Sequence, residues 1–332
     1  MVQRTQSLPF RAVLAGCDGS PEASDAVALA VSLAGICDAG LTLAGIYSHP
    51  LIPFPESYGD TARKHATEAV LRHERDAQLS QFDQRAPRAH IVAEPDTSVS
   101  RALRRVARRE GIDLVVLGSA SSAQAGRTQP GPHARQLLHN APCAAALAPR
   151  GYRERPSSLR RIAVAYDGGD EARAALRVAA ELARQTGGQL RIHEVVDERM
   201  PLGLKVAMDV INGRAIDWGS LLSAEHDEAR RRVREAASAL SVDTDATVSL
   251  GEPGFELRKL SEMVDLIVLG SMHLARRERL GIGDTAEKVL DGAACPVLVV
   301  ARPQTAAAAR PSRRWRICRF GARCLRGWSW PR

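Results

Sequence analysis

Four short apolar segments of the sequence end in residue pairs that can contact a ligand. The pairs are Asp18-Gly19, Gly118-Ser119, Asp167-Gly168 and Gly270-Ser271. A carboxylate accepts hydrogen bonds, and glycine lets a ligand approach the backbone closely. If the apolar segments are parallel strands, these pairs lie at the carboxyl ends of a sheet, where open α/β sheets bind ligands and where helix N-termini offer free N–H groups to phosphate.

The spacing of the pairs shows that the chain is a tandem duplication. The segment 13–20 matches 162–169 at an offset of 149 residues, and 113–119 matches 265–271 at an offset of 152. We therefore predict two copies, copy one at 9–150 and copy two at 160–302, joined by a linker around 151–158. Residues 303–332 form a separate basic tail.

Apolar runs of four to six residues alternate with longer amphipathic stretches in each copy, which is typical of buried parallel strands joined by crossover helices. In copy one, Ser20 is a candidate helix cap with Pro21 at the first helical position. The expected strands lie at 41–47, 90–93, 113–118 and 144–148, and the expected helices at 61–82, 98–110 and 133–139. In copy two we expect a helix at 220–240 and a closing strand at 297–300.

The composition excludes collagen-like, disordered and coiled-coil proteins. The 332 residues are 45% hydrophobic and 25% charged, as in ordinary globular domains, and only 4% are aromatic. The net charge of +8 comes from eight arginines after residue 302, so residues 1–302 sum to zero. An inference from charge to polyanion binding therefore concerns the tail alone.

These residues resemble the universal stress protein family in its tandem form. The resemblance rests on 17–23 at the end of the first strand and on 283–290 and 295–300 at the close of copy two. It implies two flavodoxin-like, Rossmann-like α/β domains, each a five-stranded parallel sheet with flanking helices. Family members pair through the last strand, so a tandem chain is expected to form a pseudo-dimer within itself.

The resemblance also implies where an adenine nucleotide would bind. In the ATP-binding branch, an Asp after the first strand and an aliphatic residue at the end of the second hold adenine, and a Gly-x2-Gly-x9-Gly-Ser/Thr loop holds ribose and phosphates. The candidate cofactor-binding residues are Asp18, Ile46, Gly118, Ser121 and Gly131 in copy one, and Asp167, Val195, Gly270, His273, Gly283, Asp284 and Thr285 in copy two.

Both loops depart from the family pattern. Copy one has Ser121 for the middle glycine and Pro132, which lacks an N–H, for the final hydroxyl residue. Copy two has His273 and Asp284 at these positions. As a helix N-cap, Asp284 would satisfy the donors that a phosphate needs, so the anion site would be self-occupied. Alternatively, Asp284 shares a Mg²⁺ ion with ATP, or the arginines of 276–279 balance the phosphate charge.

The expected function is that of a cytoplasmic stress-response regulatory or protective protein that binds ATP. The alternative is a nucleotide-free scaffold that presents a surface to a protein partner, which the altered loops favour. No catalytic constellation or metal-ligand spacing is visible, so we do not expect an enzyme, although slow ATP hydrolysis stays open.

Two cysteines, a short N-terminal box and the tail give weaker indications of function. Cys143 and Cys295 precede the closing strands at equivalent positions, where a buried small hydrophobe is expected rather than a redox thiol. The box Leu14–Cys17 resembles a lipoprotein cleavage site, but its apolar stretch is too short for a signal peptide. In the tail, three tryptophans lie among the arginines, a mixture that suits single-stranded nucleic acid or an anionic membrane, although a disordered extension is the simpler interpretation.

Overall fold

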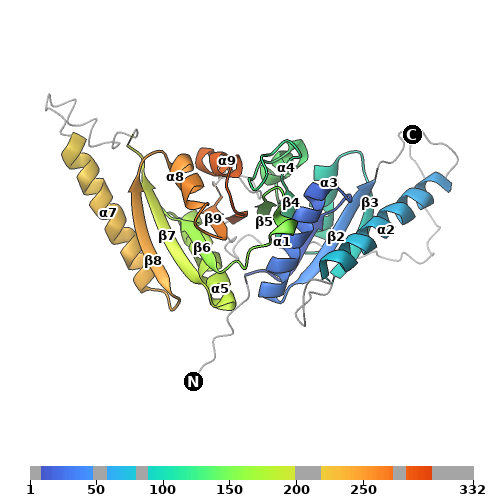
Figure 1. Cartoon of the computed structure of the whole chain (residues 1–332), viewed down its shortest axis with the longest axis horizontal. Coiled ribbons are helices and arrows are strands. Elements are labelled where there is room, and N and C mark those ends of the chain that lie inside the picture. Colours follow the sequence, from blue (N-terminus) through green and yellow to red (C-terminus); the bar gives the residue numbers. More distant parts are fainter. Residues whose placement is uncertain (1–8, 48–57, 80–88, 199–217, 272–281, 301–332) are drawn as a thin grey trace, which may run out of the picture. The chain divides into compact units, whose positions relative to one another are not determined.

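The computed structural model describes residues 9–47, 58–79, 89–198, 218–271 and 282–300, all within one compact unit that spans residues 1–302 (Figure 1). The elements of copy one are β1 (Ala12–Gly16), α1 (Pro21–Cys37), β2 (Gly40–Tyr47), α2 (Tyr58–Leu79), β3 (Ala89–Pro95), α3 (Val99–Arg109), β4 (Leu114–Gly118), α4 (Pro132–Leu138) and β5 (Ala144–Ala148). The linker contains a short 3₁₀ helix, η1 (Tyr152–Glu154).

Copy two repeats this order. Its elements are β6 (Arg161–Ala165), α5 (Asp170–Thr186), β7 (Gln189–Val196), α7 (Trp218–Ser238), β8 (Thr244–Leu250), α8 (Pro253–Leu260), β9 (Leu266–Gly270), α9 (Asp284–Leu290) and β10 (Val297–Val300). The predicted elements are all present, with bounds that shift by up to three residues. The tail and the loop 272–281 lie outside the described residues.

The ten strands form one sheet in the order β3-β2-β1-β4-β5-β10-β9-β6-β7-β8. Pairing is parallel within each copy and antiparallel between β5 and β10, where Leu298 lies opposite Ala146. The predicted fold, two five-stranded parallel sheets docked through their closing strands, is confirmed. We call the junction of β5 and β10, with the elements beside it, the seam.

The hydrophobic core continues across the seam on both faces of the sheet. Alternate residues of a strand point to opposite faces, so Ala146 and Leu298 belong to the cluster beneath α1 and α5, whereas Leu147 and Val297 belong to the cluster beneath α4 and α9. Burial of apolar surface on both faces therefore stabilises the pairing of the two copies.

The linker packs into the body of the protein. Tyr152 is buried, and the carboxylate of the buried Asp25 in α1 accepts hydrogen bonds from the backbone N–H groups of Gly151 (2.7 Å) and Arg153 (3.0 Å). At the start of copy two, Asp265 accepts from the N–H and the guanidinium of Arg161. Because a buried carboxylate needs such partners, Asp25 fixes the path of the chain between the copies.

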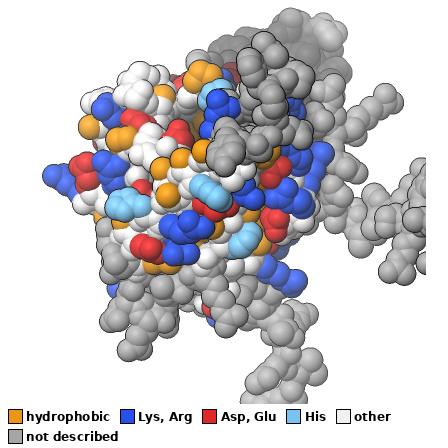
Figure 2. All heavy atoms as spheres, turned by 90° about the vertical axis from the view of Figure 1, so that its right-hand side faces the viewer, with side chains coloured by type: hydrophobic (Ala, Val, Ile, Leu, Met, Phe, Trp, Pro, Cys, Tyr) orange, Lys and Arg blue, Asp and Glu red, His pale blue; other side chains and the backbone are white. Residues whose placement is uncertain are grey.

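The outer end of copy one carries charges of both signs. Figure 2 shows this face, where basic, acidic and histidine side chains are intermixed. The exposed side chains of α2 there include Arg63, Lys64, His65, Arg72 and Asp76. This mixture agrees with the zero net charge of residues 1–302.

Candidate functional site

Each copy has a cleft at the carboxyl ends of its strands. In copy one β2 lies on one side of β1 and β4 on the other, and this switch point opens a cleft of ≈ 500 Å³, a size typical of ligand pockets. We call it cleft one. The candidate residues that line it are Asp18, Ile46, Gly118, Ser121 and Gly131.

The equivalent cleft two has a volume of ≈ 560 Å³ and lies at the ends of β6, β7 and β9. The candidate residues that line it are Asp167, Val195, Gly270, Gly283, Asp284 and Thr285. His273 lies outside the described residues. The structure thus brings eleven of the twelve candidate residues into two clefts related by the repeat.

The two aspartates at the strand ends shape the turn that follows them. Asp18 Oδ1 accepts from the N–H of Ser20 at 2.9 Å, and Asp167 Oδ1 accepts from the N–H of Gly169 at 2.8 Å. Ser20, not Asp18, caps α1, because its side chain accepts from the N–H of Ala23. Each aspartate therefore combines a local structural role with a place in its cleft.

Gly118 and Gly270 are needed where a strand passes close to a helix. A Cβ at Gly118 would lie 1.9 Å from the carbonyl oxygen of Glu22 in α1, and one at Gly270 would lie 2.7 Å from the backbone of Glu171 in α5. These two glycines therefore have a packing reason to be glycine whether or not a phosphate binds.

Asp284 does not cap α9, so the expectation that it occupies the anion site was wrong. The capping residue is Gly283, and no side chain caps this helix end. Asp284 is the first helical residue, and its 88% exposed carboxylate lies 3.5 Å from Lys288 Nζ. A side chain at this position points outward along the helix surface and does not reach back to the free N–H groups.

The loop of copy one reaches across the seam. The N–H of Thr128 donates to the carbonyl of Ala293 at 2.8 Å, and the Arg127 guanidinium donates to the Gly292 carbonyl at 3.2 Å. Pro132 is the first residue of α4 and brings no N–H to cleft one. This loop therefore joins the copies and is poorly suited to hold a phosphate.

The described linings of both clefts are acidic. Cleft two contains the carboxylates of Asp167, Glu171 and Asp284, and cleft one those of Asp18 and Glu22. Neither lining includes a lysine or arginine among the described residues. These carboxylates would repel the phosphates of a nucleotide, and a bound cation would offset that repulsion.

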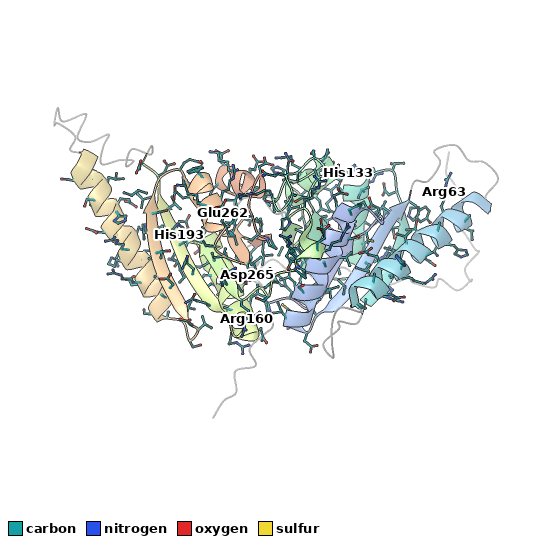
Figure 3. The ribbon with its side chains drawn as sticks, viewed as in Figure 1. Arg63, His133, Arg160, His193, Glu262 and Asp265 are labelled. Atoms are coloured by element: carbon teal, nitrogen blue, oxygen red, sulfur yellow. The ribbon has the colours of Figure 1, made fainter. Side chains whose placement is uncertain are left out.

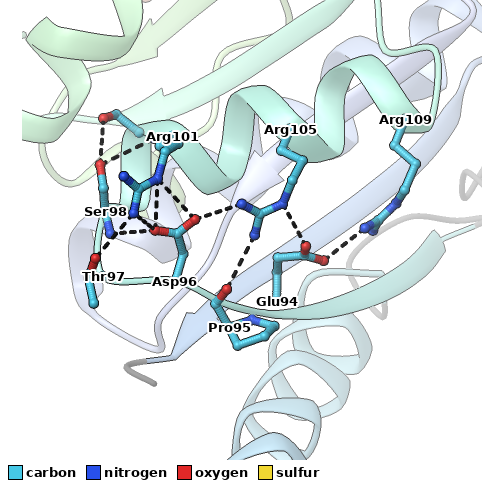
Figure 4. A network of polar contacts seen from close by, with 9 residues as sticks. Glu94, Pro95, Asp96, Thr97, Ser98, Arg101, Arg105 and Arg109 are labelled. Carbon is cyan, nitrogen blue, oxygen red and sulfur yellow. Dashed lines mark hydrogen bonds and ion pairs between the residues drawn. The ribbon is translucent and has the colours of Figure 1, made fainter. Parts of the chain in front are cut away.

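Two arginines of α3, a helix that contributes to cleft one, are engaged elsewhere. Although Val99 and Leu103 of α3 line this cleft, Arg101 and Arg105 on the outer side of α3 are bound by Asp96, at 2.5 and 2.7 Å (Figure 4). Hydrogen bonds from Arg101 hold the pKa of Asp96 well below its usual range. Charge-assisted bonds of this kind fix the arginines to the end of β3.

His193 is a residue of cleft two that sequence reasoning missed. It projects from β7, is 8% exposed, and its Nδ1 and Nε2 lie 2.8 and 3.1 Å from the hydroxyls of Thr247 and Ser249 (Figure 3). Burial lowers its pKa, and Arg191 adds to this effect. The repeat offset pairs His193 with Ala44 of copy one, and a comparison of the two copies at this position would have revealed it.

The cysteines are suited to packing. Burial raises the pKa of the Cys143 thiol to about 12 and that of the Cys295 thiol further still. A thiol that stays protonated is a poor nucleophile and metal ligand, so the structure supports the expected role of these residues as small hydrophobes.

The described residues contain no group of three or more His, Cys, Asp or Glu side chains that could hold a metal ion. None of the helices in the described part of the chain is long and apolar enough to cross a membrane.

The fold and its clefts define a tandem flavodoxin-like α/β protein with two ligand-sized clefts at the carboxyl ends of its strands. A model of the universal stress protein family matches residues 9–149 and 158–301, and the chain therefore belongs to this family. Membership supports a role in the response to stress. The family is generally non-enzymatic, and slow ATP hydrolysis stays an open prediction for this chain.

Individual relatives and structures agree with this assignment. A universal stress protein of Methanocaldococcus jannaschii is 30% identical over 149 residues, which is 44% of this chain and 84% of that protein. A putative universal stress protein of Staphylococcus epidermidis is 30% identical over 146 residues, 43% of this chain and 84% of that protein. The crystal structure of a universal stress protein from Archaeoglobus fulgidus, 16% identical, covers 90% of this chain and all of its own, with a TM-score of 0.60.

Proposed function

We propose that copy two binds an adenine nucleotide, with ATP as the first candidate, in cleft two, and that copy one serves mainly as its structural partner. The chain would then act as a nucleotide-responsive stress protein without catalysing a reaction. The observation that carries the proposal is the convergence of Asp167, Val195, Gly270 and the 283–285 segment on one cleft of ≈ 560 Å³. In the family that this chain resembles, these positions hold adenine, ribose and phosphates.

The difference between the copies favours cleft two. In copy one the loop 119–131 is tied to copy two by Arg127 and Thr128, and Pro132 removes a donor. In copy two the carboxylate of Asp284 is turned toward Lys288 and leaves the start of α9 uncapped by a side chain. A ligand in cleft two therefore does not have to displace the carboxylate of Asp284 from the start of α9.

The acidic lining favours a divalent cation as part of the proposed binding. Asp167, Glu171 and Asp284 supply carboxylate oxygens, the ligand type that Mg²⁺ prefers, and a nucleotide supplies phosphate oxygens. When bound, Mg²⁺ would neutralise part of the phosphate charge. We therefore expect Mg²⁺ to strengthen the binding of ATP.

Two variants test the proposal, and each of them fills one of the two clefts with a larger side chain. Val195 and Ile46 occupy equivalent positions at the ends of β7 and β2, and each is partly exposed in its cleft. In calorimetric titrations with ATP and Mg²⁺, we expect Val195→Trp to abolish binding and Ile46→Trp to leave it within about twofold. Equal loss in both variants, or retention in Val195→Trp, would contradict the proposal, provided that melting shows both proteins to be folded.

The scaffold function is the second candidate, and the loop of copy one favours it. A loop held by the seam presents a fixed surface and needs no ligand. Absence of ATP binding by the parent protein, with and without Mg²⁺, would support the scaffold over the nucleotide sensor.

A further inference from the structure

The position of α9 links cleft two to the seam. Gly283, Asp284 and Thr285 at its start line cleft two, and its end at Leu290 leads to Gly292 and Ala293 beside copy one. The helix has seven residues, a length of about 10 Å, and a helix this short is not stable by itself. Its position therefore depends on tertiary contacts, which are the packing of Ala286, Val289 and Leu290 in the core and the contacts at its end.

In copy one the end of the equivalent helix, α4, is bound by a side chain of the same copy. At the end of α4, Asn140 Nδ2 donates to the carbonyl of Gln136 at 3.3 Å. The repeat offset of 152 places Gly292 at this position in copy two, and glycine has no side chain to do the same. Gly292 has a φ of +141°, a backbone conformation that disfavours any residue with a side chain at this position.

At the end of α9, Thr128 of copy one provides the side-chain hydrogen bonds. Its hydroxyl accepts from the N–H of Ala293 at 3.0 Å and donates to the carbonyl of Val289 at 3.5 Å, while its own N–H donates to the Ala293 carbonyl at 2.8 Å. Thr128 is 1% exposed and Ala293 fully buried. The N–H of Ala293 also donates to the Val289 carbonyl at 3.1 Å, so the Thr128 hydroxyl adds a second partner to each of these two buried groups and ties the end of α9 to copy one.

We infer that Thr128 is a positioning residue for cleft two: the loop of copy one clamps the end of α9 and thereby sets the position of the 283–285 segment. The loop of copy one, which departs from the phosphate-binding pattern, would then serve to position α9 of copy two. The clamp itself follows from the contacts at Thr128, whereas its effect on nucleotide affinity rests on the proposed function.

Two substitutions of Thr128 separate the hydroxyl from the shape of the side chain. Thr128→Val keeps the shape and removes the hydroxyl, and Thr128→Ser keeps the hydroxyl. Ser122→Ala, an exposed position in the same loop, is the matched control. Amide hydrogen exchange is measured in α9 and at Ala293, with β1 as the internal reference for global unfolding, and the affinity for ATP with Mg²⁺ is measured by calorimetry.

We expect Thr128→Val to raise exchange at Ala293 and in α9 by tenfold or more relative to β1, and to weaken ATP binding about fivefold. Thr128→Ser and Ser122→Ala should stay within twofold of the parent in both measurements. If exchange rises equally in α9 and β1, or does not rise, Thr128 is not a clamp and the inference is overturned. If exchange rises in α9 while ATP affinity is unchanged, the clamp does not position the site and the inference is also overturned.

The exchange measurement does not depend on ATP. A parent protein that binds no ATP contradicts the proposed function, and selective exchange in α9 then still decides whether Thr128 is a clamp. Should Thr128→Val fail to fold, Arg127→Gln loosens the same junction by removing the bond to the Gly292 carbonyl. It should raise exchange in α9 more than in β1, and the opposite result would overturn the clamp.

Discussion

The carboxylate of Asp284 lies 3.5 Å from the ammonium group of Lys288, one helical turn further along α9. The carboxylate lies on the outer surface of the helix, at the rim of cleft two, and the same ammonium group also donates to Glu252 Oε1 at 3.0 Å. The Asp284 carboxylate therefore does not fill the helix start, but it faces any phosphate that approaches. Repulsion between exposed charges is modest because water screens it.

Replacing Asp284 by Ser should strengthen ATP binding about fivefold in the absence of Mg²⁺, because the replacement removes this repulsion. With Mg²⁺ the gain should shrink, since the cation already offsets the carboxylate in the parent. Calorimetric titration of both proteins with and without Mg²⁺ measures the effect. A Ser variant that binds ATP no better than the parent would show that the charge of Asp284 does not limit binding.

Gly118→Ala should destabilise the protein by about 2 to 4 kcal/mol, because the new methyl group would overlap the carbonyl of Glu22 in a tightly packed region. Gly131→Ala is the control, since its Cβ would lie 3.6 Å from Ala120, at ordinary contact distance. Denaturant unfolding gives both values. Similar stabilities of the two variants would argue against the close approach of β4 and α1.

His193 should make the protein less stable below neutral pH. Because burial lowers its pKa from the ordinary value of 6.5, protonation favours the unfolded chain, so its contribution is complete above pH 6.5 and is lost as pH falls. The charged groups near it are Arg191, Glu256 and Asp245. His193→Gln cannot titrate, so its melting temperature should fall less than that of the parent between pH 7.5 and 5.5. Parallel pH profiles would exclude His193 as a source of this dependence.

Removal of residues 303–332 should reduce affinity for single-stranded nucleic acid and leave the melting temperature unchanged. The excess positive charge of the chain lies in this segment, and the segment is too short to bury a core of its own. Binding is compared between the full chain and the truncated chain at several salt concentrations. Equal binding by both forms would show that the tail does not contribute to nucleic-acid binding.

Most of the fold could be predicted from the sequence because the repeat and the apolar runs are local patterns. The cap at Ser20, the closing strand 297–300 and the pairing of the copies followed from such patterns and from the family resemblance. The position of Asp284 did not, because the side chain of a capping residue and that of the first helical residue point in different directions although they are neighbours in sequence. The role of Thr128 depends on contacts 165 residues apart, which no local pattern reveals.

The central claim is that one of the two clefts, cleft two, takes an adenine nucleotide. Native mass spectrometry of the gently purified full chain with ATP and Mg²⁺ counts the bound nucleotides directly. We expect a mass increase of one nucleotide per chain in the parent protein and none in Val195→Trp. A chain that carries no nucleotide, or two, or that keeps its nucleotide after Val195→Trp, would contradict the account.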